Sequence, residues 1–190
     1  MDPIQEINYQ KDTTLLLLVA AQRAGYKIFY IEQSDMFIEN CVPKTSMSRM
    51  KVFEHPEKWY EKQVPLVGAL EMLDVILMRK DPPFDSEYIY STYILEAAER
   101  RGCLVVNKPS SLRDCNEKIF ATQFPECTPP ILVSRKKTLL KDFLAEHNDV
   151  VLKPLDGMGG KSIFRVQKHD SNVNVILETL TREGEQTIMA

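Results

Sequence analysis

The sequence predicts an α/β protein in two parts, with a parallel sheet covered by helices in the first part and a small α+β unit in the second. Strand-like and helix-like segments alternate along the first half, which is typical of a parallel sheet whose crossovers are helices. The run LDVILM at residues 73–78 is continuously apolar, as in a strand buried on both faces. In the second half, a glycine-rich loop separates two further strand-like runs.

The composition is that of an ordinary globular protein. The chain has 190 residues, of which 44% are hydrophobic and 27% are charged, and its formal net charge is −3. These proportions allow a buried core. The net charge gives no electrostatic reason to expect nucleic acid or an anionic membrane as a partner, and we expect neither.

The cysteines and the N-terminal apolar run indicate a cytoplasmic protein. Cys41, Cys103, Cys115 and Cys127 form no C-x-x-C pair and have no histidine at zinc spacing, so we expect reduced thiols. The run LLLLVAA at residues 15–21 is similar to the core of a signal peptide, but acidic residues precede it and it is too short to cross a bilayer. We interpret it as a buried helix.

The elements of the first part are predicted from their end signals. Asp12 or Thr13 can begin the first helix and Gly25 can end it, while Gly102 can end the second helix. Because the first helix follows a loop and not a strand, we expect the opening strand of the sheet to lie upstream of Met1. We expect helices at residues 13–24 and 85–101, strands at residues 27–31, 73–78 and 103–106, and a short excursion at residues 36–42.

The second part has the pattern strand, helix, strand, loop, strand and helix. We place its boundary near residues 108–112, where Pro-Ser-Ser interrupts the pattern, and expect domains at residues 1–110 and 111–190. The chain stops where another strand begins, near Ile188, so we expect the protein to continue downstream. We expect helices at residues 113–122, 137–147 and 173–182, and strands at residues 131–133, 150–153 and 162–167.

The strongest chemical signal is the run KPLDGMGG at residues 153–160. A strand delivers Lys153, and a loop with three glycines follows at once. Glycines let backbone N–H groups approach phosphate oxygens, and a turn of such amides forms an anion-binding nest to which a lysine adds positive charge. The run matches neither the Walker pattern nor G-x-G-x-x-G. A plain glycine-rich hairpin between two strands is the alternative.

Two further basic residues stand out by their positions. Lys118 lies on the predicted helix that opens the second part, and the alternative is an ordinary solvated lysine. Arg79 ends the apolar strand before a Pro-Pro turn, and ligands of parallel α/β sheets bind at the carboxyl ends of strands. Its guanidinium could clamp a substrate carboxylate through two hydrogen bonds. The alternative is an ion pair with Asp81 or Asp85.

Several runs resemble the ATP-grasp family, and within it the bacterial glutathione synthetases. They are MRKDPPFD at residues 78–85, NKP at 107–109, LRDCNEK at 112–118 and LKPLDGMGG at 152–160. The resemblance implies a Rossmann-like (pre-ATP-grasp) first domain, a central ATP-grasp subdomain, and a third domain that is missing here. It also implies glutathione synthase activity, in which ATP drives the ligation of γ-glutamylcysteine and glycine through an acyl phosphate. The products are glutathione, ADP and phosphate.

The resemblance also implies roles for particular residues. Two lysines contact the ATP phosphates and a loop closes over them, and the matching positions are Lys118, Lys153, Asp156, Gly157, Met158, Gly159 and Gly160. From its position at the end of the apolar strand, and not from the resemblance, Arg79 is the candidate catalytic residue. Family members use Mg²⁺ and carry its ligands in the third domain, so we expect no metal ligand within this chain. The family also suggests a homo-oligomer.

Other functions fit parts of the same pattern. One is another ATP-grasp carboxylate–amine ligase, although the run MRKDPPFD favours glutathione synthetase. A second is a non-catalytic ATP-grasp relative that binds ATP for regulation or assembly. A plain Rossmann-like binding module is disfavoured, because no glycine-rich turn follows a first strand. Since the metal-binding domain is missing, we expect this polypeptide alone to be inactive.

Overall fold

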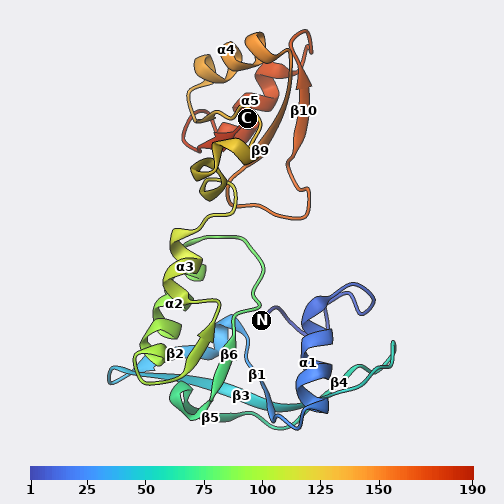
Figure 1. Ribbon diagram of the computed structural model, residues 1–190, viewed down its shortest axis with the longest axis vertical. Helices are drawn as coiled ribbons and strands as arrows, with labels where there is room; N and C mark the ends of the chain where they lie inside the picture. Colours follow the sequence, from blue (N-terminus) through green and yellow to red (C-terminus); the bar gives the residue numbers. More distant parts are fainter. The chain divides into compact units, whose positions relative to one another are not determined.

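The computed structural model describes residues 1–190, which form two compact units (Figure 1). Unit 1 consists of Met1–Asp81 and Ser86–Arg113, and unit 2 consists of Pro82–Asp85 and Asp114–Ala190. None of the helices combines the length and the apolar character that crossing a membrane requires.

Unit 1 combines helices with several short strands and one long strand. Its elements in chain order are α1 Thr13–Arg23, β1 Ile28–Tyr30, the 3-10 helix η1 Gln33–Asp35, β2 Met36–Glu39, β3 Val42–Val52, β4 Tyr60–Lys62, β5 Leu66–Ala69, the 3-10 helix η2 Leu70–Met72, β6 Val75–Leu77, α2 Ser86–Glu99, β7 Leu104–Val106 and α3 Pro109–Asp114. The helices and strands expected from the end signals are present here, with ends that differ by a few residues.

The main sheet of unit 1 is antiparallel, which corrects the expected parallel sheet. β3 is its centre and pairs antiparallel with β1, β2, β4 and β5. The segment from β2 through the start of β3, which we expected to be a short excursion, is a hairpin that turns at Asn40 and Cys41, both with positive φ. Parallel pairing is limited to β6 and β7. The mixed α/β class is thus confirmed, but the Rossmann-like parallel sheet is not clearly formed.

Helix α1 packs on one end of the antiparallel sheet. Asp12 caps it, its carboxylate accepting from the Thr14 backbone N–H at 2.7 Å. The helix buries Leu15 and Val19 in a cluster that also contains Ile4, Ile28, Tyr30, Met50 and Val52. Trp59 lies at the margin of this cluster, where its indole N–H donates to the Ile4 carbonyl at 3.0 Å and its ring lies near those of Tyr9 and Tyr60.

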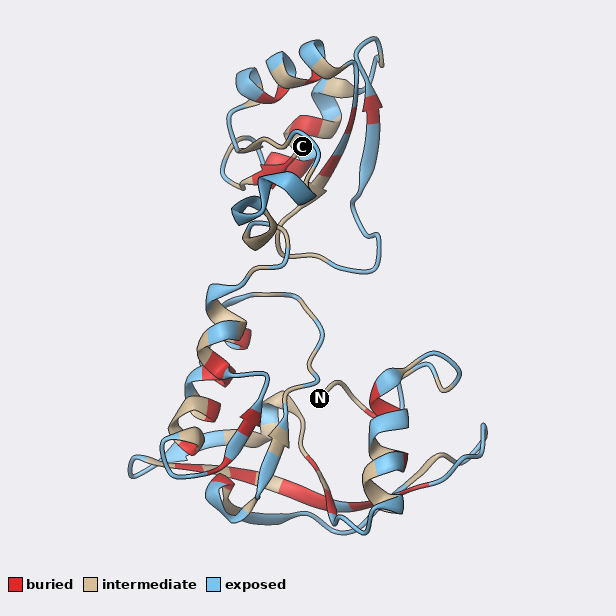
Figure 2. Cartoon of the chain, in the orientation of Figure 1, coloured by how far each residue is buried: buried red, intermediate tan, exposed pale blue.

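The parallel pair β6–β7 is covered on one face only (Figure 2). Val105 is buried and Ile76 half-buried on the face that packs with α2. The opposite face exposes four large apolar side chains to between 39% and 56%, namely Val75, Leu77, Leu104 and Val106.

Unit 2 is an antiparallel sheet packed against two helices. Its elements are the 3-10 helices η3 Phe120–Gln123 and η4 Pro125–Cys127, β8 Val133–Ser134, α4 Lys137–His147, β9 Asp149–Pro154, β10 Phe164–Gln167, α5 Val173–Thr181 and β11 Ile188–Met189. The strands are ordered β10-β9-β11-β8, and each pairing is antiparallel. One buried cluster joins the sheet to α4 and α5 and contains Leu140, Leu144, Val150, Leu152, Val166, Leu177, Leu180 and Ile188.

The helix expected at residues 113–122 is wrong. α3 ends at Asp114, and the chain continues through turns to η3. Asn116 interrupts the helix because its side-chain oxygen accepts from the backbone N–H groups of Lys118 and Ile119, both at 3.1 Å. Such a local side-chain turn competes with helix formation.

Candidate functional site

The glycine-rich loop connects the paired strands β9 and β10. The last paired residues on either side are Leu152 and Phe164, so the connection is much longer than a two-residue hairpin turn. Gly159 and Gly160 have φ angles of +67° and +77°, a region that strains residues with a Cβ. Two of the loop's glycines are therefore required by the backbone, and the loop is a hairpin connection with an extended tip.

Lys118 lies against this loop. Its ammonium donates to the carbonyl oxygens of Gly157 at 2.8 Å and Leu155 at 3.4 Å, and it pairs with Glu117 at 2.7 Å. The Lys118 side chain is only 14% exposed. Residues that are distant in the sequence thus meet here, and the structure brings Lys118 together with the loop.

The contact with Lys118 also affects the acidity of its neighbour. Burial raises the pKa of the Glu117 carboxyl, but hydrogen bonds from Lys118 and from its own backbone amide outweigh burial and hold the pKa below its ordinary value. Glu117 is therefore ionised near neutral pH and partly neutralises the Lys118 ammonium.

Lys153 reaches the same region from the sheet. It lies on β9 opposite Met189 of β11, and it is half-buried. Its ammonium makes no hydrogen bond or ion pair with another protein group. A half-buried cation without a protein partner, two residues before the Leu155 carbonyl that Lys118 contacts, is available to an anionic ligand.

The remaining loop residues are held to different degrees. The Asp156 carboxylate accepts from the Gln186 side-chain amide at 3.3 Å and 3.4 Å, and its carbonyl accepts from the Phe84 backbone N–H at 3.5 Å. Met158 is 46% exposed. The base of the loop is thus anchored by side chains of unit 2, while its tip is exposed.

Asn116 and Gln186 are contacts that sequence reasoning missed. Asn116 lies inside the quoted run LRDCNEK, but no role was assigned to it, and its amide donates to the Leu155 carbonyl at 3.0 Å. Gln186 precedes β11 in a polar stretch that contains no recognisable motif. Neither residue type signals a site by itself, because both act through partners that are distant in the sequence.

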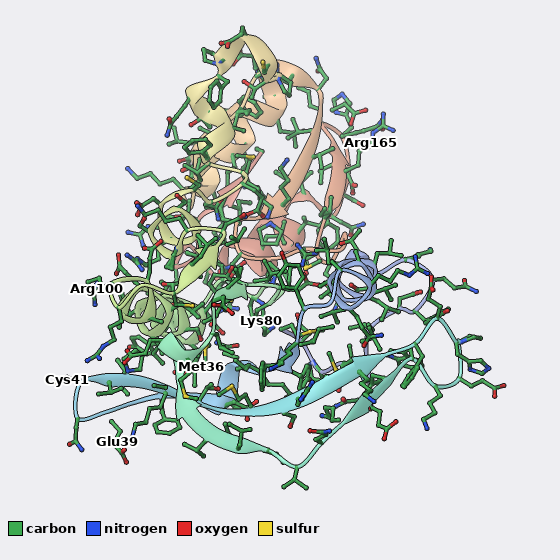
Figure 3. The ribbon with its side chains drawn as sticks, turned by 60° about the horizontal axis from the view of Figure 1, so that its bottom comes forward. Met36, Glu39, Cys41, Lys80, Arg100 and Arg165 are labelled. Atoms are coloured by element: carbon green, nitrogen blue, oxygen red, sulfur yellow. The ribbon has the colours of Figure 1, made fainter.

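Arg79 belongs to unit 1 and follows β6. Its guanidinium donates to the hydroxyls of Thr14 at 3.1 Å and Thr13 at 3.0 Å, in the first turn of α1. The neighbouring Lys80 (Figure 3) pairs with the Asp2 carboxylate at 2.7 Å. The segment after β6 is therefore tied to the N-terminal residues and α1, and Arg79 itself remains exposed.

The chain offers no metal centre of its own. No group of three or more His, Cys, Asp or Glu side chains is arranged to hold a metal ion. Mg²⁺ in phosphate-binding sites is held by one or two carboxylates together with phosphate oxygens and waters, and the lysines of this site, Lys118 and Lys153, are not ligands for it.

Two family profiles match the chain. The profile described as prokaryotic glutathione synthetase, N-terminal domain, matches residues 1–113. The profile described as prokaryotic glutathione synthetase, ATP-grasp domain, matches residues 117–190. Together they cover nearly the whole chain.

Individual relatives agree with the profiles. Glutathione synthetase of Pseudomonas aeruginosa is 57% identical over all 190 residues, and those of Photorhabdus laumondii and Vibrio cholerae are each 54% identical. The chain spans 60% of the length of each of these curated relatives. A solved ATP-grasp ligase of Chryseobacterium gregarium, in complex with ADP and a leader and core peptide, has 15% identity and a TM-score of 0.40 over 86% of this chain and 49% of that one.

Proposed function

Because the chain belongs to the prokaryotic glutathione synthetase family, we propose that it supplies the substrate-binding and ATP-binding parts of a glutathione synthase. The reaction is the ATP-dependent ligation of γ-glutamylcysteine and glycine through an acyl phosphate, giving glutathione, ADP and phosphate. Residues 1–110 act as the pre-ATP-grasp, substrate-binding domain. Residues 111–190 act as the central ATP-grasp subdomain.

The observation that carries this proposal is the contact between Lys118 and the glycine-rich loop. Phosphoryl transfer depends mainly on positioning and on neutralising charge, so lysines and backbone amides can serve without a nucleophilic side chain. Lys118 and Lys153 bind the ATP phosphates, and phosphate oxygens replace the loop carbonyls as acceptors for Lys118. The five loop residues that close over the nucleotide are Asp156, Gly157, Met158, Gly159 and Gly160.

Closure of the loop protects the intermediate. An acyl phosphate is hydrolysed when water reaches it, so the site must exclude water between the two chemical steps. Gly159 and Gly160, which have positive φ angles, and the exposed tip allow the loop to change conformation, and the bond between Asp156 and Gln186 holds the point at which the closing segment begins.

Arg79 is the proposed clamp for the substrate carboxylate. A guanidinium has five N–H donors, and the hydroxyls of Thr13 and Thr14 accept from two of its nitrogens. These bonds orient the group and leave donors for a carboxylate, which arginine binds in a bidentate manner.

Three further properties belong to the proposed whole enzyme. Mg²⁺ neutralises the phosphates when bound, and its ligands come from the third domain that the family resemblance implies. The enzyme is a homo-oligomer. It acts in the cytoplasm, where its cysteines remain reduced.

The test uses a completed enzyme, in which this chain is joined to the segments of the Pseudomonas aeruginosa relative that it does not match. We expect it to make glutathione from ATP, Mg²⁺, γ-glutamylcysteine and glycine, and we expect the 190-residue chain alone to be inactive. Lys153→Met should weaken ATP binding or turnover at least about tenfold, the scale of one charged hydrogen bond. Unchanged ATP kinetics in that variant would overturn the nucleotide assignment.

A further inference from the structure

One side chain connects the Lys118 turn to the start of the glycine-rich loop. The Asn116 oxygen accepts from the backbone N–H groups of Lys118 and Ile119 at 3.1 Å each. The amide nitrogen of the same side chain donates to the Leu155 carbonyl at 3.0 Å. Asn116 is half-buried, so these bonds are partly shielded from competing water.

We propose that Asn116 is a positioning residue for nucleotide binding, which sets the Lys118 ammonium against the loop that follows Lys153. This inference rests on the proposed function, because it assumes that the two lysines share a phosphate ligand. Asn116 itself touches no reacting group. It acts through the turn that carries Lys118.

The geometry supports a role in positioning more than a role in local folding. A turn at residue 116 needs only an acceptor, which serine or aspartate would also provide. An amide carries its acceptor and its donor on two separate atoms, so its oxygen can accept from the turn while its nitrogen donates to a more distant carbonyl. Asn116 uses its donor to bind the Leu155 carbonyl, which lies on a segment far away in the sequence.

The position of Leu155 makes this bond consequential. Its carbonyl also accepts from the Lys118 ammonium at 3.4 Å, so Asn116 and Lys118 share one acceptor. When a phosphate takes over the Lys118 ammonium, the Asn116 bond remains and keeps the base of the loop beside the lysine. Without it, the loop and Lys118 must be brought together at the expense of binding energy.

Two substitutions separate the two halves of the contact. Asn116→Ser keeps a hydroxyl that can accept from the turn amides but is too short to reach Leu155, whereas Asn116→Ala removes both contacts. Asn172→Ala is the matched control, because Asn172 is exposed in the same unit and its side chain makes no capping hydrogen bond.

The first measurement is amide hydrogen exchange in the 190-residue chain without nucleotide. We expect amides of residues 155–161 to exchange at least about fivefold faster in both Asn116 variants, the scale of one lost hydrogen bond. The turn amides of Lys118 and Ile119 should exchange faster only in Asn116→Ala. Loop exchange that is unchanged in Asn116→Ser would overturn the bridging role.

The second measurement is steady-state kinetics of the completed enzyme. Both Asn116 variants should raise the KM for ATP about five- to tenfold while kcat changes less than about twofold, and Asn172→Ala should change neither. Full rescue of the KM by serine would show that only the local turn matters and would overturn the inference. If Lys153→Met reduces ATP binding while the Asn116 variants do not, the inference fails and the proposed function stands. If Lys153→Met also has no effect, both fail.

Discussion

The four-stranded sheet of unit 2 and the parallel strand pair of unit 1 bury their apolar side chains to very different extents. In unit 2, the three strands β9, β10 and β11 each contribute to one continuous core with α4 and α5. In unit 1, β6 and β7 bury one face, while the other face exposes Val75, Leu77, Leu104 and Val106 to between 39% and 56%.

The two kinds of sheet normally differ in how their faces are covered. Antiparallel sheets commonly leave one face to solvent and carry polar residues there, whereas parallel strands are normally covered on both faces and are apolar throughout. β6 and β7 have the sequence of covered strands but not the cover. In unit 2, the strands that carry the candidate site pack in one continuous core with α4 and α5. In unit 1, the strand before Arg79 is stabilised mainly by packing on one of its faces.

The largest expected effect is on the core of unit 2. Ile188→Ala removes a fully buried side chain, which should reduce the free energy of unfolding by about 2–5 kcal/mol. Leu104→Ala, at a position that is 56% exposed, should cost less than about 1 kcal/mol. Urea denaturation of the two variants measures the difference, and equal losses would break the comparison.

The next prediction compares the two candidate sites. In the completed enzyme, Arg79→Ala should raise the KM for γ-glutamylcysteine about ten- to a hundredfold, as expected for a lost charged hydrogen bond of about 1.5–3 kcal/mol. The KM for ATP should change less than about twofold. The control is Arg100→Ala, because Arg100 directly follows α2 and its exposed side chain (Figure 3) pairs with Glu96. A selective effect on ATP would move Arg79 to the nucleotide site.

A smaller effect is expected from the buried hydroxyl of Tyr30 in unit 1. It accepts from the Ile4 N–H at 3.0 Å and donates to Glu32 at 2.5 Å, so Tyr30→Phe leaves a buried donor unpaired at a cost of about 1–3 kcal/mol. Burial first, and then the bond to Glu32, raises the pKa of Tyr30.

The raised pKa of Tyr30 gives a pH signature. Its contribution to the free energy of unfolding is complete below the ordinary tyrosine pKa of about 10 and is lost as pH rises toward the higher folded value. The wild-type chain should therefore lose stability more steeply than Tyr30→Phe between pH 9 and 11 (about one unit either side of that pKa). Parallel pH profiles would contradict this assignment.

The smallest effect is expected at Glu117. Its lowered pKa means that its contribution is present above the ordinary carboxyl pKa of about 4.3 and is lost as pH falls through the folded value. The Glu117 side chain is 67% exposed, so solvent screens the pair and Glu117→Gln should change stability by less than about 0.5 kcal/mol. The same variant should bind ATP slightly more tightly, because Lys118 loses a competing anion. Weaker ATP binding would indicate that Glu117 orients Lys118.

Local signals in the sequence predicted most elements, and nonlocal pairing explains the failures. The helix at residues 137–147 has the predicted bounds, and Asp12 and Gly25 act at the ends of α1 as expected. The predicted parallel direction of the main sheet was wrong because β1 pairs antiparallel with β3, a strand whose alternating burial we did not recognise in the sequence. Strand direction depends on partners that no local pattern specifies.

The charged residues of the candidate site could be predicted from the sequence, but the hydrogen bonds that hold the site together could not. The resemblance indicated Lys118, Lys153 and the glycine loop, and the structure brings Lys118 and the loop together. The roles of Asn116 and Gln186 depend on bonds to Leu155 and Asp156, which require the folded chain. The same side chain of Asn116 also ends the helix that we expected at residues 113–122, since its turn replaces the helical hydrogen bonds.

Trp59 gives the molecule a built-in optical reporter. It is the single tryptophan of the chain, and it lies in unit 1 with its indole bonded to the Ile4 carbonyl and its ring 6.1 Å from that of Tyr9. Its fluorescence emission therefore shifts when unit 1 unfolds, whereas unfolding of the helices in unit 2 does not change the emission. Following emission and helical ellipticity in the same melt would resolve whether the two units unfold together or one after the other.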